Sequence, residues 1–156
     1  MKKFIKLNFL FILFFLLSCS PKIIHSGYYS FESECLGVEL EGSQTLKAWG
    51  RGKNRKDAVE QARKNAVRDV IFNGIRKGSA DCNLKPIILE VNAHERYEDY
   101  FNAFFADDGP YKDFITNDDR APVEKHLAGN DLVCGVTVRV LRSDLKKQLK
   151  WDSILK

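Results

Sequence analysis

The sequence lacks the spaced motifs that mark common metal, redox and hydrolytic sites. Its four cysteines include no Cys-x-x-Cys pair, so the usual spacing for redox catalysis and for a zinc ribbon is absent. The three histidines, His25, His94 and His126, have neither the His-x-x-x-His nor the His-Glu-x-x-His spacing of metal sites. No Gly-x-Ser-x-Gly elbow occurs either. We therefore expect a chain that is not an enzyme and that holds no metal and no cofactor.

A large excess of one charge is also missing. Lys and Arg total 25 against 21 for Asp and Glu, a formal net charge of +4, and Lys2, Lys3 and Lys6 precede any acidic residue. Without these three lysines the net charge is about +1, too small to indicate a nucleic-acid-binding protein. The length of 156 residues suits one ordinary domain, and a hydrophobic content of 44% argues against a disordered chain.

No apolar run approaches the roughly 20 residues that a permanent transmembrane helix needs. The unbroken run over residues 9–17 follows the basic start Met1-Lys2-Lys3-Phe4-Ile5-Lys6. A basic start before a short apolar run is typical of an export signal and not of a stop-transfer anchor.

The end of this run, Leu16-Leu17-Ser18-Cys19, resembles the lipobox of bacterial lipoproteins. In that family an aliphatic residue, a tolerant position and a small residue precede a cysteine, the chain is cleaved before the cysteine, and the cysteine is lipidated. The resemblance implies a lipoprotein signal peptide over residues 1–18 and a mature chain that begins at lipidated Cys19. Two or more acyl chains hold a protein firmly on a membrane, at about 0.8 kcal/mol per buried CH₂. The alternative is a plain secretory signal in which Cys19 is incidental.

Residues 19–30 are expected to form a lipidated tether, because they include Pro21, Gly27 and several polar side chains. At about 3.3 Å per extended residue the tether reaches no more than about 35 Å. Ser20, by analogy with families that are sorted on this position, favours the outer membrane, although that sorting rule differs between lineages and leaves the leaflet open. The remaining residues, 31–156, are expected to form a single domain.

Three cysteines remain after Cys19, and any single disulfide among them leaves one thiol over. Cys134 lies in the alternating stretch 131–141, so we expect it to be a small buried hydrophobe on one face of a strand. Cys35 and Cys82 both lie beside turn-like sequence, and an exported chain can keep a disulfide. This link would close a 47-residue span and stabilise the fold by roughly 4 kcal/mol. Three reduced thiols are the competing interpretation.

The hydrophobic pattern predicts an α+β fold, with a small mainly antiparallel sheet packed by two or three helices. Residues 36–40 and 45–49 alternate on either side of Gly42-Ser43, which predicts a hairpin. The clearest helix spans about residues 55–73. Asn54 is its candidate N-cap and Gly74 its stop. On one face alanines recur at every fourth position and would let the helix approach a sheet closely, and the charged opposite face is expected to be solvated.

Further elements are predicted in the second half of the chain. Asn92-x-x-Glu95 has the spacing of a capping box for a helix that extends to about residue 106 and whose aromatic stripe is expected to be core. Residues 117–130 are expected to form an irregular polar connection before the strand at 131–141. Ser143 is expected to cap a final basic helix.

The order of a strand, Gly50-x-Gly52 and a helix with alanines at every fourth position resembles a group of small lipoproteins. These share a fold with the N-terminal domain of the flagellar T-ring protein. The match covers about residues 45–75 and the later strand at 131–141, whereas the segment 92–120 has no counterpart in it. The resemblance implies a non-catalytic role in building or bracing a larger machine of the cell envelope.

Gly50-x-Gly52-x-x-Arg55 also resembles a dinucleotide fingerprint superficially, but the third glycine is absent. An exported domain also lies outside the cytoplasm, where such cofactors are scarce. An anionic glycan or lipid headgroup is therefore the preferred ligand of this basic turn, and solvated positive charge is the simpler interpretation. The residues concerned are Arg51, Lys53, Arg55 and Lys56.

These features predict a lipoprotein anchored in the outer membrane, on the periplasmic face. It would act as an adaptor or assembly element of a cell-envelope complex, with secretion or motility machinery as the setting. Its partners would be the membrane, through the N-terminal lipid, and the proteins of that complex. The alternative function is a binding module for an anionic glycan or lipid headgroup.

Overall fold

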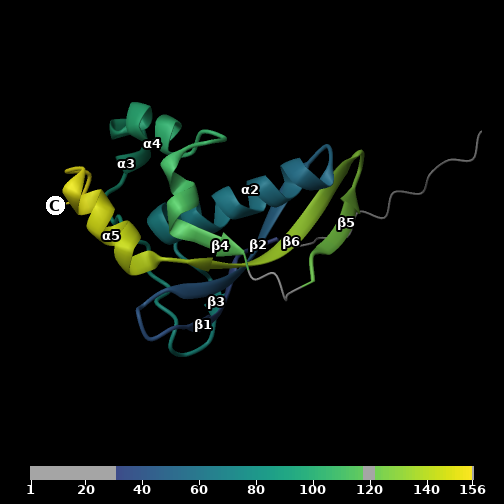
Figure 1. Cartoon of the computed structure of the whole chain (residues 1–156), viewed down its shortest axis with the longest axis horizontal. Helices are drawn as coiled ribbons and strands as arrows, with labels where there is room; N and C mark the ends of the chain where they lie inside the picture. Colours follow the sequence, from purple (N-terminus) through teal and green to yellow (C-terminus); the bar gives the residue numbers. More distant parts are fainter. Residues whose placement is uncertain (1–30, 118–121, 156) are drawn as a thin grey trace, which may run out of the picture.

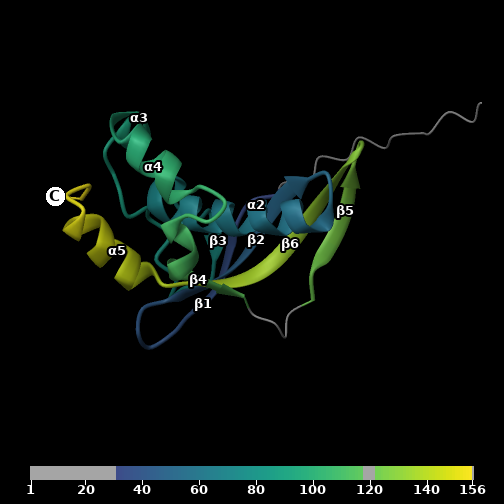
Figure 2. The ribbon, with the colours of Figure 1, turned by 45° about the horizontal axis from the view of Figure 1, so that its top comes forward.

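Figure 1 shows the computed structural model, which describes residues 31–117 and 122–155. Within these ranges the chain forms a six-stranded sheet, with helices on one face and beyond one end of it (Figures 1 and 2). The strands are β1 (Glu34–Val38), β2 (Gln44–Gly52), β3 (Lys77–Gly78), β4 (Ile115–Asn117), β5 (Glu124–Ala128) and β6 (Asp131–Val140). The helices are α2 (Arg55–Arg68), α3 (Ala93–Arg96), α4 (Glu98–Phe104) and α5 (Arg142–Trp151), with a π-helical turn η1 (Asp69–Asn73) and a 3-10 turn η2 (Pro110–Phe114).

The strand order is β3-β1-β2-β6-β4, and β5 pairs with β6 as well. Strands β1 and β3 are parallel, and the other described pairs are antiparallel. The predicted α+β fold with a small, mainly antiparallel sheet is confirmed. The described residues contain four α-helices instead of two or three, because the predicted helix around residues 92–106 is divided into α3 and α4.

The central strands β2 and β6 alternate between two faces of the sheet, as their period-two pattern predicted. Leu46 and Ala48 of β2 are fully buried opposite Val138 and Val136 of β6, and α2 packs against this face. The described helices lie on this side or beyond the end of the sheet (Figure 2). We call the second face the open face. It carries Thr45, Lys47, Trp49 and Arg51 of β2 and Val133, Gly135, Thr137 and Arg139 of β6.

Helix α2 begins where the sequence predicted, and its continuation η1 ends at the predicted stop. The Asn54 side chain accepts a hydrogen bond from the Asp57 N–H at 3.0 Å, which satisfies one of the free donors of the first turn. The helix continues through η1 to Gly74, whose φ of 72° lies in the left-handed region that glycine adopts without strain. The three alanines of the sheet-facing side, Ala58, Ala62 and Ala66, are fully buried, as expected.

The glycines before α2 are explained by its close approach to β2. A Cβ at Gly50 would lie 2.1 Å from the Ala62 nitrogen and 2.3 Å from the Ala58 oxygen, and a Cβ at Gly52 would lie 2.5 Å from the Ala58 nitrogen. Backbone atoms of α2 thus occupy the space that any larger side chain would need. The two glycines of the Gly-x-Gly pattern therefore allow α2 to pack closely on β2. In a dinucleotide fingerprint the same glycines would instead make room for a ligand.

The predicted solvation of the charged face of α2 is only partly correct. Tyr111 of η2 packs against this face and is fully buried. Lys64 Nζ lies 5.7 Å from the Tyr111 ring centroid, and the side chains of Arg63 and Lys64 are only 19% and 16% exposed. Long charged side chains can lie along a packed surface in this way while their polar ends stay paired.

Three local predictions in the second half of the chain are wrong. Asn92 has a left-handed φ of 63° and makes no side-chain cap, so the capping box does not form. Ser143 lies inside α5, which begins at Arg142 without a side-chain cap. The stretch predicted to be irregular contains β4 and β5, and β5 forms a hairpin with β6 around Gly129. The aromatic stripe is core as expected, with Phe101, Phe104 and Phe105 buried.

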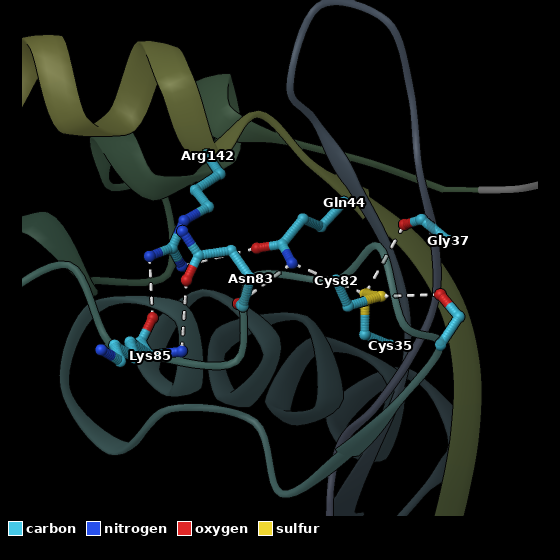
Figure 3. The surroundings of a disulfide bond; sticks show 8 residues. Cys35, Gly37, Gln44, Cys82, Asn83, Lys85 and Arg142 are labelled. Carbon is cyan, nitrogen blue, oxygen red and sulfur yellow. Dashed lines mark hydrogen bonds between the residues drawn. A yellow bond between two sulfur atoms is a disulfide. The ribbon is translucent and has the colours of Figure 1, made fainter.

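A disulfide joins Cys35 of β1 to Cys82 in the loop after β3, and Cys134 is a buried free thiol. Figure 3 shows that the same loop is also tied to β2 and α5 by side chains. Gln44 Nε2 donates to the Asn83 carbonyl at 3.1 Å, and an Arg142 Nη donates to the Lys85 carbonyl at 2.7 Å. The disulfide and these hydrogen bonds together hold the loop against the sheet.

Reduction of this disulfide is expected to lower the free energy of unfolding by roughly 4 kcal/mol, because the unfolded chain regains the entropy of a 47-residue span. Equilibrium unfolding in urea, with and without a reductant, measures the change. The double variant Cys35→Ser/Cys82→Ser is the control, and the reductant should not alter its midpoint. An equal shift in that variant would assign the loss to something other than the disulfide.

Candidate functional site

The four basic residues grouped by the sequence do not surround one site. Arg51 lies on the open face, where its Nε donates to Asp131 Oδ2 at 2.7 Å. Lys53 is exposed in the turn before α2. Arg55 and Lys56 lie in the first turn of α2 and line a cleft on the helix-covered side of the sheet. The structure thus divides the expected anion-binding residues between two surfaces.

This cleft, which we call the basic cleft, lies between the N-terminal half of α2 and the outer edge of the sheet. Its volume of about 780 Å³ is in the range of small-molecule sites. From α2 it is lined by Arg55, Lys56, Val59, Glu60 and Arg63. From the sheet it is lined by Asn117, Pro122, Val123, Val136 and Thr137.

The sheet side of the basic cleft coincides with a gap in strand pairing. Strand β2 occupies one edge of β6 along residues 132–140, so β4 and β5 share the other edge. There, β4 pairs with residues 138–140 and β5 pairs with residues 131–135. Val136 and Thr137 therefore have no described strand partner on the edge that borders the cleft.

The carboxylate of the basic cleft is already engaged by neighbouring groups. Glu60 Oε2 lies 3.3 Å from an Arg63 Nη, and Glu60 Oε1 lies 3.6 Å from Lys112 Nζ. The Tyr111 hydroxyl donates a hydrogen bond to Glu60 Oε1. Burial of Tyr111 and this hydrogen bond raise the pKa of its hydroxyl above the ordinary value, so the phenol stays a donor at neutral pH.

The open face carries a cluster of three rings, which we call the ring cluster: Phe31, Trp49 and His126. The centroid distances are 5.2 Å for Phe31 and Trp49, 5.4 Å for Trp49 and His126, and 6.2 Å for Phe31 and His126. The Trp49 ring lies over Gly135, where a Cβ would approach it to 2.7 Å. Lys47 Nζ lies 5.0 Å from the Trp49 ring centroid, within cation–π range.

Polar pairs border the ring cluster on several sides. Lys47 Nζ lies 2.5 Å from Glu124 Oε1, and Arg51 pairs with Asp131 as described above. Further along the sheet an Arg139 Nη lies 3.1 Å from Glu39 Oε1. An apolar centre with a charged rim is the usual anatomy of a protein-binding surface.

Sequence reasoning predicted Arg55 and Lys56 of the basic cleft but missed Arg63 and the ring cluster, for identifiable reasons. The alternation that buries Ala48 places Trp49 on the open face, so the period-two pattern of β2 is the signal that could have located Trp49. His126 was assigned to an irregular connection, so nothing placed it beside Trp49. Arg63 lies on the face of α2 that was predicted to be solvated. Tyr111 packs against this face from a distant segment, and a local sequence pattern does not reveal such a contact.

Two of the three histidines, His94 and His126, lie within the described residues. His94 packs edge-on against Phe72, with centroids 5.4 Å apart, and no group of three or more His, Cys, Asp or Glu side chains in residues 31–117 and 122–155 could hold a metal ion. His25, Cys19 and the tether over residues 19–30 lie outside the described residues. None of the helices in the described ranges has the length and apolar character needed to cross a membrane.

Comparison of the chain with protein-family models, with curated proteins and with solved structures finds no match. The function is therefore inferred from the residues of this chain and their geometry.

Proposed function

We propose that this chain is a lipid-anchored, non-catalytic adaptor of a cell-envelope complex, and that the open face binds the partner protein. The observation that carries the proposal is the ring cluster on a sheet face to which α2 does not pack. Aromatic side chains contribute large contact areas and are enriched at protein interfaces. Phe31 and His126 are exposed and Trp49 is half-buried, so a partner could cover all three rings.

The sequence supports the anchored part of the proposal. The Leu16–Cys19 pattern supports a lipid at Cys19, and Phe31 directly follows the predicted tether. A tether of at most about 35 Å keeps the ring cluster close to the bilayer. The resemblance of residues 45–75 to small envelope lipoproteins supports secretion or motility machinery as the setting, on the periplasmic face of the outer membrane.

A photoreactive amino acid at Thr45, on the open face, is expected to give a discrete adduct of higher mass in intact cells. The same substitution at Asn102, on the exposed side of α4, is the control and should give no such adduct. Immunoblotting after illumination measures both. Equal labelling patterns from the two positions would contradict docking at the open face.

The adduct should depend on the ring cluster. Trp49→Ala is expected to reduce the Thr45 adduct about tenfold or more, since truncation of a central Trp at an interface commonly costs 2 kcal/mol or more. Trp151→Ala is the matched control, because Trp151 is 86% exposed at the end of α5. An adduct that also forms with the purified chain alone, at twice the monomer mass, would show self-association and would overturn the adaptor role.

A further inference from the structure

We infer that the basic cleft is a separate binding site for an amphipathic anion, a molecule with one phosphate or carboxylate group on a small hydrocarbon body. The cleft lies on the side of the sheet that α2 covers, and the ring cluster lies on the opposite side. The ring cluster and the cleft share no residue, although Thr137 of the open face also borders the cleft at the edge of the sheet. Binding in the cleft can therefore be tested independently of docking at the open face.

The charges of the lining select an anion. Arg55, Lys56 and Arg63 contribute three positive charges, and Glu60 is the one carboxylate among the lining residues that the structure describes. Tyr111, Lys112 and Arg63 already engage Glu60. Within the described ranges neither Arg55 nor Lys56 has a direct ion-pair partner, and Lys56 interacts with Asp107 only at longer range. The cleft thus retains positive charge that an oxyanion would neutralise.

Arg63 adds a specific hydrogen-bond donor. Its side chain is 19% exposed, and its Nε is a buried side-chain nitrogen without a hydrogen-bond partner in the described residues. Buried donors are normally paired, and a guanidinium forms its strongest hydrogen bonds with carboxylate or phosphate oxygens. A bound oxyanion would supply the acceptor that the described residues do not.

The rest of the lining selects a hydrocarbon body. Val59, Val123 and Val136 contribute aliphatic surface next to the charged side chains, and Pro122 adds to it. None of the described lining residues is aromatic, so they offer no ring on which a base or a sugar could stack. These features favour an alkyl phosphate or carboxylate over a nucleotide or a glycan.

The test uses hexyl phosphate, inorganic phosphate and hexanol as three probes. Each is titrated calorimetrically into the full chain held in phosphatidylcholine nanodiscs, with empty discs as the blank. Hexyl phosphate is expected to bind at least about tenfold more tightly than either of the other two, because it alone satisfies both the charged and the apolar lining. Equal affinity for inorganic phosphate would reduce the site to a simple anion site and overturn the inference, as would the absence of any binding.

Variants assign the binding to the cleft. Arg63→Met keeps an unbranched apolar stem, removes the charge and the guanidinium donors, and should weaken hexyl phosphate binding about tenfold or more. Arg55→Gln changes an exposed residue without a described partner, so it should weaken binding without disturbing the fold. Arg76→Met is the control, since Arg76 is 80% exposed and lies outside the cleft. Unchanged binding of hexyl phosphate in both cleft variants would overturn the assignment. If hexyl phosphate binds as expected but the Thr45 adduct does not form in cells, only the adaptor role is contradicted.

Discussion

Gly50→Ala is expected to destabilise the domain by about 3 kcal/mol or more, at the upper end of the cost of overpacking a core. The added methyl group would lie 2.1 Å from the Ala62 nitrogen and 2.3 Å from the Ala58 oxygen. Both are backbone atoms of α2, so no change of side-chain rotamer can relieve the contact. The helix would have to move away from β2 and from the fully buried side chains around it. For a domain with a total stability of 5 to 15 kcal/mol, roughly the usual range, this loss is large.

Gly37→Ala is the matched control for this prediction. Gly37 is also a strand glycine, but a Cβ there would meet nothing within 4 Å. Its substitution should change stability by no more than about 1 kcal/mol, and a reduced entropy of the unfolded chain could make the change favourable. Urea midpoints at equal slope measure both variants. A Gly50→Ala midpoint as high as that of Gly37→Ala would contradict the close packing of α2 on β2.

The parts of the fold that the sequence predicts well have local causes. Small side chains at every fourth position define the buried face of α2, and the Asn54 cap and Gly74 stop act within a few residues. The alternation in β6 lies within one strand, and its inward side chains, such as Val138, are fully buried. In each case the pattern that predicts the element lies within the element itself or within a few residues of it.

The parts that the sequence does not predict depend on neighbours. Strand β5 is exposed along most of its length, so burial imposes no alternation on its side chains. Gly129-Asn130 before Asp131 is a two-residue hairpin signal that could have located it. Asn92-x-x-Glu95 has the right letters for a capping box, but Asn92 takes a left-handed conformation in which no side-chain cap forms.

The same distinction applies to the two candidate surfaces. The rings of Phe31, Trp49 and His126 come from three separate segments, and pairing with β6 brings β2 and β5 close enough for two of them to meet. The basic cleft combines Arg55 and Arg63 of α2 with residues near β4 and β5. Sequence patterns identified the basic turn, but only the fold shows which of its charges share a cavity.

Conversion of the lipobox to a plain secretory cleavage site should release the protein from the membrane. The triple variant Leu16→Ala/Ser18→Ala/Cys19→Ser provides small residues at the positions that a secretory signal peptidase recognises and removes the thiol that would be lipidated. Acyl chains contribute about 0.8 kcal/mol per buried CH₂, so their loss should shift nearly all of the protein from the membrane fraction to the soluble periplasmic fraction. Cell fractionation and immunoblotting measure the distribution.

Cys134→Ala serves as the control, because it removes a buried thiol of β6 and leaves the N-terminal segment unchanged. It should remain with the membranes. A triple variant that also stays with the membranes after an alkaline wash would show that another part of the chain provides the anchor. The tether would then not position the open face.

Mass spectrometry of the N-terminal peptide from the natural mature protein tests membrane anchoring most directly. The account predicts a peptide whose first residue is Cys19 and whose mass includes covalently attached acyl groups. A peptide that still carries residues 1–18, or one in which the Cys19 thiol is free, would contradict a lipid anchor and the adaptor function built on it.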